Sequence, residues 1–173
     1  MDLRISPLYR SLLACGIFAI AGALGWYFTS DGERSFPLVG YYAILVVNTF
    51  FSIKTFAAIT PQNTTQDLAD IVLVLIYIAL AFSFSSVLLF SASSTMLFLV
   101  AIGKYVHLMM LITYRNFLRR KIRLNALGAS LSLCALALAL SGQPAEAAWL
   151  LFGLFAVANI YLLAINPMYR LDD

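Results

Sequence analysis

Six long apolar runs, separated by short polar breaks, constrain this chain more than any other feature. The runs cover residues 11–28, 36–59, 68–90, 95–114, 124–140 and 149–165. A helix needs about 20 apolar residues to cross a bilayer core of about 30 Å, and each run has roughly that length. The sequence therefore predicts an all-α fold, a bundle of six transmembrane helices that forms one domain over residues 1–173.

Composition excludes the main soluble classes. The chain is 62% hydrophobic and only 11% charged, whereas a soluble domain is about 45–50% apolar and about 25% charged. Too little polar surface remains to cover a water-soluble globule of this length. An ordinary soluble enzyme, a nucleic-acid-binding domain and a disordered chain are all excluded. The expected partner is the lipid bilayer, and no nucleic acid is expected despite the net charge of +3.

Polar stretches mark the expected helix ends at residues 30–34, 60–67 and 141–144. The break between the third and fourth spans is harder to place, because two serine clusters compete for it. We expect it at residues 91–94, where serine can cap the following helix. Residues 83–86 are the alternative, which would leave one short helix and one long helix.

The basic residues predict the orientation of the bundle. With a cytoplasmic N-terminus and six alternating spans, eight of the eleven Lys and Arg side chains face inside and only Arg34 faces outside. This is the positive-inside bias of membrane proteins. The eight are Arg4, Arg10, Arg115, Arg119, Arg120, Lys121, Arg123 and Arg170. We expect both termini in the cytoplasm and the chain in a plasma membrane of the bacterial inner-membrane type, with an uncleaved first span.

The run 115–123 carries five of these basic residues between two spans. A basic cluster beside a membrane attracts anionic lipid headgroups at about 1 kcal/mol per charge. Arg119, Arg120, Lys121 and Arg123 are therefore candidate headgroup-binding residues. The simpler interpretation is that the run sets the orientation of the bundle.

Four ionisable residues remain within the spans or at their edges: Lys54, Asp70, Lys104 and His107. A charge inside a bilayer costs about 2.5–3.5 kcal/mol on insertion scales, so such residues are candidates for function. Lys104 lies near the middle of its predicted span, and His107 follows on the same helical face. The pair could line a polar pathway, bind an anion or relay protons, or it could hydrogen-bond to neighbouring helices and fix packing.

Lys54 and Asp70 lie at similar depth on consecutive spans, and we predict a salt bridge between them. Asp70 shares a helical face with Tyr77, and Asn48 begins a polar stripe that continues at Ser52 and Thr55. Such a stripe in a bilayer faces other helices or water. Asn48 and Tyr77 therefore join the candidate pathway, and a hydrogen-bonded helix seam is the alternative.

Small residues predict close helix packing in two spans. Ala19, Gly22 and Ala23 cluster in the first, and Gly128, Ser132 and Ala135 form a stripe along the fifth. This pattern lets helix backbones approach. It does not distinguish packing within one bundle from a homo-oligomer or from contact with a partner membrane subunit.

No catalytic or metal-binding constellation stands out. The chain has one histidine, no clustered acids and no phosphate-binding loop, and both cysteines fall inside apolar runs. We therefore predict no metal site and no cofactor. An intramembrane enzyme acting on lipid would need converging reactive groups, which only Lys54 and Asp70 could supply.

Two functional hypotheses follow. The first is a small channel or transporter-like protein for an ion or small polar solute, based on Lys104, His107 and the polar stripe. The alternative is a non-catalytic accessory, assembly or sensory subunit of a larger membrane complex, based on the small-residue faces.

Overall fold

The structure, a computed structural model, describes residues 6–29, 31–61 and 63–169. Within these ranges it is all-helical, and six helices are long and apolar enough to cross a membrane. They are α1 (Pro7–Thr29), α2 (Phe36–Ile59), α3 (Thr64–Ala81), α4 (Val87–Leu111), α5 (Arg115–Leu140) and α6 (Pro144–Ile160). A π-helical turn, Tyr161–Ile165, prolongs α6, and a 3₁₀ turn, Gly32–Ser35, precedes α2. The prediction of an all-helical chain with six helices of membrane-spanning length and hydropathy is confirmed.

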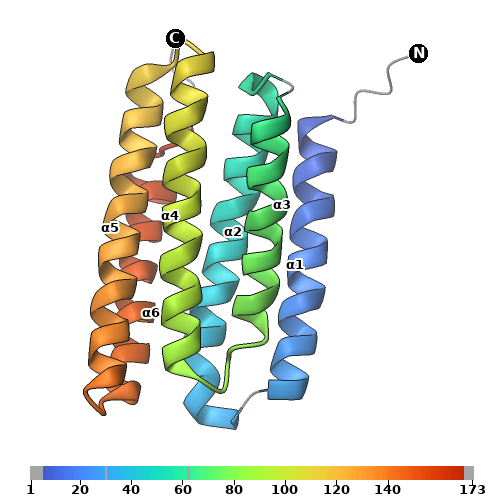
Figure 1. The fold of residues 1–173 in the computed structure, drawn as a ribbon. Helices are drawn as coiled ribbons and strands as arrows, with labels where there is room; N and C mark the ends of the chain where they lie inside the picture. The colour runs from blue at the N-terminus through green and yellow to red at the C-terminus, as the bar shows by residue number, and fades with distance from the viewer. Residues whose placement is uncertain (1–5, 30, 62, 170–173) are drawn as a thin grey trace.

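The helices run alternately up and down, so α1 begins and α6 ends at the same end of the bundle (Figure 1). We call this the terminal end; it also carries the α2–α3 and α4–α5 connections. The opposite end, with the α3–α4 connection at residues 82–86, is the distal end. α4 packs against α3 and α5, and α2 packs against α1 and α6, whereas α2 and α3 contact each other sparsely. This sparse contact leaves room for a cavity between α2 and α3.

The distal half has a closely packed aromatic core. Tyr41 is fully buried, and its ring lies 4.1 Å from that of Phe155 and 5.4 Å from that of Phe90, centroid to centroid. Its hydroxyl is 2.7 Å from Ser94 Oγ, which is 2.8 Å from Ser132 Oγ. This buried chain of hydroxyls joins α2, α4 and α5, and each polar group in it has a partner, as burial requires.

α1 and α3 meet at the backbone level near the distal end. A Cβ atom built on Gly25 of α1 would overlap the carbonyl oxygen of Ala81 in α3. Only glycine allows this approach. α1 is thereby held against the end of α3.

The break between the third and fourth helices lies at the alternative position and not at residues 91–94. Asn63 caps α3 by accepting a hydrogen bond from Thr65 N at 2.9 Å, so α3 begins four residues earlier than predicted and ends at Ala81. Ser86 caps α4 by accepting from Leu89 N at 3.3 Å. Ser91 and Ser94 consequently lie inside α4 and are buried.

The basic run 115–123 also differs from its expected form. It is not a loop but the first turns of α5, which begins at Arg115. The run contains neither Gly nor Pro, and Arg, Lys and Leu all favour helices. α1 and α6 likewise begin earlier than predicted, each with a proline at its first residue, where the missing N–H costs nothing. Arg4 and Arg170, two of the eight residues used to predict orientation, lie outside the described residues.

Candidate functional site

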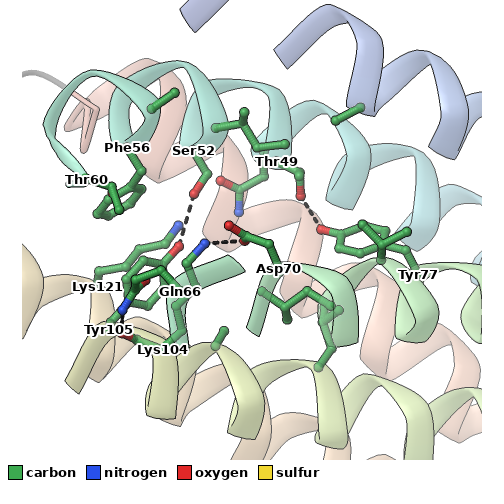
Figure 2. A pocket seen from close by; sticks show the side chains of 18 of the residues that line it. Thr49, Ser52, Phe56, Thr60, Gln66, Asp70, Tyr77, Lys104, Tyr105 and Lys121 are labelled. Atoms are coloured by element: carbon green, nitrogen blue, oxygen red, sulfur yellow. Dashed lines mark hydrogen bonds and ion pairs between the residues drawn. The ribbon is translucent and has the colours of Figure 1, made fainter. Parts of the chain in front are cut away.

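A cavity of about 370 Å³ lies in the terminal half of the bundle. Side chains of α1 to α5 line it, with α2, α3 and α4 contributing most. Figure 2 shows Asp70, Lys104 and Lys121 converging there from α3, α4 and α5. The charged lining residues lie toward the terminal end, and the deeper lining is largely apolar, with Phe18, Leu45, Leu97 and Phe98 beside the hydroxyls of Thr49 and Tyr77.

Among the residues that the structure describes, one ion pair is present, and it joins Asp70 to Lys104. The side chain of Lys104 is 12% exposed and that of Asp70 is 57% exposed. The predicted Lys54–Asp70 bridge is therefore wrong. Ser52 and Phe56 of α2 line the cavity, whereas Lys54, between them, is exposed and does not line it. Residues two apart on a helix do not share a face, so Lys54 points away from α3.

Lys104 lies closer to the terminal end than the sequence predicts. α4 spans Val87–Leu111 instead of residues 95–114, so its middle lies nearer the distal end, and Lys104 is about 10 Å from the end of the helix at Leu111, at about 1.5 Å per residue. Lys104 therefore lines the cavity in the terminal half of α4 and does not lie at the middle of the helix.

His107 takes part in a contact between α3 and α4. Gln66, which is 2% exposed, donates from Nε2 to His107 Nδ1 at 2.8 Å and lies 3.2 Å from the Lys104 carbonyl oxygen. His107 does not line the cavity. These contacts match the packing interpretation of His107, with Gln66 holding α3 against α4.

Lys121 lies inside the bundle, at 7% exposure, and not on a surface that a lipid headgroup could reach. Its ammonium donates to the Tyr169 hydroxyl, and its Nζ lies 4.7 Å from the centroid of the Tyr169 ring and 5.9 Å from that of Tyr105. Burial raises the pKa of the Tyr169 hydroxyl, which therefore stays protonated and donates to Asn48 Oδ1. The network Lys121–Tyr169–Asn48 joins α5, the segment after α6, and α2.

The other basic residues of the run lie at the surface or near it. Arg119 and Arg123 are exposed, and Arg120 donates from Nη2 to the Asn166 carbonyl oxygen at 3.3 Å. Headgroup binding by these three arginines stays a prediction.

Two of the three residues in the predicted polar stripe of α2 line the cavity. Asn48 and Ser52 line the cavity and Thr55 does not. Ser52 Oγ lies 3.2 Å from the Tyr105 hydroxyl, and the neighbouring Thr49 hydrogen-bonds to the Tyr77 hydroxyl (Figure 2). The candidates Asn48, Asp70, Tyr77 and Lys104 thus meet in one cavity.

Sequence reasoning missed several lining residues. Gln66, Tyr105 and Asn125 are buried polar residues of the site. Asn125 could have been found, since it lies one turn after Lys121 on the same face of one helix. Tyr169 gives no such signal, because it reaches Lys121 across 48 residues of sequence.

A second concavity lies on the outside of α1 and α2. It is an apolar groove of about 580 Å³, in which the small residues Ala19, Gly22, Ala23 and Ala43 lie beside Val39, Val46 and the larger Trp26, Tyr42 and Phe84. The small residues noted in the first span therefore face a groove as well as the bundle.

The described residues hold no group of three or more His, Cys, Asp or Glu side chains that could bind a metal ion. Cys15 and Cys134 are free thiols. No known protein family, curated protein or solved structure matches the chain.

Proposed function

We propose that this chain is a small transporter-like protein of a plasma membrane, with both termini in the cytoplasm, that binds a small polar solute and moves it across the bilayer. The observation that carries the proposal is the cavity, in which Asp70, Lys104 and Lys121 meet inside a bundle of membrane-spanning type. Ionisable side chains that face a cavity within spans mark solute and ion pathways in membrane proteins.

The contrast between the two halves of the bundle supports a transporter over an open channel. The cavity occupies the terminal half, whereas the aromatic core around Tyr41, Phe90 and Phe155 fills the distal half. A solute would bind from the terminal end, and the distal core would have to open before it could leave. Binding at one depth followed by opening to the other side is alternating access.

Uptake into proteoliposomes tests this proposal. The purified chain is reconstituted, and the entry of radiolabelled lactate, glycine, glucose and choline is compared with entry into protein-free vesicles. At least one solute should enter faster with the protein. Lys104→Gln, which removes a cavity charge, should slow that entry, and Lys54→Gln, which changes an exposed lysine, should not. Entry no faster than in protein-free vesicles for all four solutes overturns the proposal.

The groove on α1 and α2 favours a second candidate, a non-catalytic accessory, assembly or sensory subunit. Small residues such as Ala19, Ala23 and Ala43 leave room for a helix of a partner subunit or of a second copy of the chain. Purification in mild detergent tests it. A stoichiometric partner that Ala23→Trp removes supports this function, and a chain that purifies alone contradicts it.

A further inference from the structure

We infer that the cavity binds a small organic monocarboxylate, and that Lys121 and Asn125 donate hydrogen bonds to its carboxylate. This inference rests on the proposed function and names the class of solute. It begins from two buried polar groups of α5 whose hydrogen-bonding capacity is not used within the described part of the chain.

The first group is the ammonium of Lys121. It has three N–H donors, and one of them reaches the Tyr169 hydroxyl. The two aromatic rings beside it attract a cation, but they do not neutralise it. The one ion pair of the described residues joins Asp70 to Lys104, so no described carboxylate lies within 4.0 Å of the Lys121 ammonium. Burial without a counter-charge destabilises the ammonium, and an anion bound beside it would remove that cost.

The second group is the side-chain amide of Asn125, which is 7% exposed. Its Nδ2 is buried and has no hydrogen-bond partner. Asn125 follows Lys121 by one helical turn, so the two side chains share a face of α5, and both line the cavity. An unpaired buried donor in a native protein calls for an explanation, and a ligand oxygen in the cavity supplies one.

The chemistry of the lining selects a monocarboxylate over other anions. Asp70 and Lys104 neutralise each other, so one buried positive charge remains to match one negative charge. An ammonium and an amide N–H together suit the two oxygens of a carboxylate. Beyond them the lining becomes apolar at Leu97 and Phe98, which suits a short hydrocarbon body. The cavity volume of about 370 Å³ falls within the usual range for small-molecule sites.

Equilibrium dialysis of the full chain in detergent tests the inference with three ligands of similar shape. Butyrate carries one negative charge, butyramide carries none, and butylphosphonate carries up to two. Butyrate should bind about tenfold or more tightly than butyramide, the factor that one charge-assisted hydrogen bond supplies. Equal binding of these two ligands both in the wild type and in the variant D172N/D173N, or tighter binding of butylphosphonate than of butyrate, overturns the inference.

Variants locate the site. Lys121→Gln and Asn125→Leu should each weaken butyrate binding, with Lys121→Gln removing the preference over butyramide. Lys54→Gln is the matched control on an exposed lysine and should bind as the wild type does. Size-exclusion profiles check that each variant is folded. If one variant is misfolded, the other variant and the comparison of butyrate with butyramide test the inference. Unchanged butyrate binding in folded Lys121→Gln protein overturns the inference.

The terminal aspartates of the chain need a control of their own. Asp172 and Asp173 lie outside the described residues and follow Tyr169 closely in the sequence. Each ligand is therefore measured again on D172N/D173N. A butyrate preference in either background supports the inference, and its absence in both overturns it.

The binding and uptake experiments can fail separately. If glucose or choline enters proteoliposomes and butyrate does not bind, the proposed function stands and the monocarboxylate is wrong. If butyrate binds but none of the four uptake solutes enters, the site stands and transport is wrong.

Discussion

The ion pair between Asp70 and Lys104 joins two side chains with unequal access to solvent. The Asp70 side chain is 57% exposed, whereas that of Lys104 is 12% exposed. When one member of a pair is removed, the cost depends on whether the member left behind can be hydrated. The two single substitutions should therefore differ in their effects.

We expect Asp70→Asn to lower stability by about 1–3 kcal/mol, the cost of leaving a buried group without its partner. Lys104→Gln should cost less, because the Asp70 side chain that remains is already 57% exposed. Apparent melting temperatures in detergent measure both effects, and Lys54→Gln serves as the reference. Equal losses of stability in the two variants would show that the exposure of the remaining side chain does not determine the cost of breaking the ion pair.

At the residue scale, the sequence predicted which charges matter better than it predicted their partners. Lys104 and Asp70 were found because charges are rare in apolar runs. The pairing of Asp70 with Lys104 depends on which faces of α2, α3 and α4 meet at the cavity. Lys104 and Lys121 line the cavity, whereas Lys54 on α2 is exposed and faces away from it. The role of Lys121 was missed for a related reason, since its partner Tyr169 arrives from a segment distant in sequence.

At the element scale, the contact of α1 with α3 depends on one glycine. Gly25→Ala would place a methyl group against the carbonyl of Ala81, and backbone cannot move aside as a flexible side chain can. We expect a loss of about 1–3 kcal/mol or more, the usual cost of overpacking, measured as a lower apparent melting temperature.

Gly16→Ala on the same helix is the matched control, because an added Cβ there meets no atom within 4 Å. It should leave stability unchanged or raise it by up to about 1 kcal/mol through helix propensity. A Gly25→Ala protein as stable as Gly16→Ala would contradict the close approach of α1 and α3.

The hydroxyl chain Tyr41–Ser94–Ser132 links three helices and gives a second prediction at this scale. Ser94→Ala removes the shared partner of two buried hydroxyls, at an expected cost of about 1–3 kcal/mol. Ser130→Ala is the control, since Ser130 is exposed and its hydroxyl donates to the Ala126 carbonyl of its own helix, with no other partner among the residues that the structure describes. Thermal unfolding of the two variants should separate them, and equal stability would argue against the linked hydroxyls.

The boundary between α3 and α4 shows what hydropathy leaves undecided. Two serine clusters stand in one long apolar stretch, and either could cap a helix. Ser86 does so, whereas Ser94 instead hydrogen-bonds across helices to Tyr41 and Ser132. This choice depends on the positions of α2 and α5, which no local pattern contains. The number of helices, by contrast, followed from the length of the apolar runs alone.

At the scale of the whole molecule, the proposed orientation has a direct test. The terminal end carries the basic start of α5, so we expect it in the cytoplasm. Alkaline phosphatase fused after Gly142, in the distal α5–α6 turn, should be active outside the membrane. The enzyme fused at residue 113, in the α4–α5 connection, should be inactive. The reverse pattern would invert the orientation.

The division of the bundle into a cavity half and a packed half also has an electrical consequence. Water and mobile ions in a cavity carry the potential of the adjoining solution inward, so a transmembrane voltage would fall mainly across the packed aromatic half. One elementary charge that crosses the full voltage gains or loses about 2.3 kcal/mol per 100 mV. A charged solute would therefore reach Lys121 almost independently of voltage, and would meet nearly the whole field while passing the level of Tyr41 and Phe90.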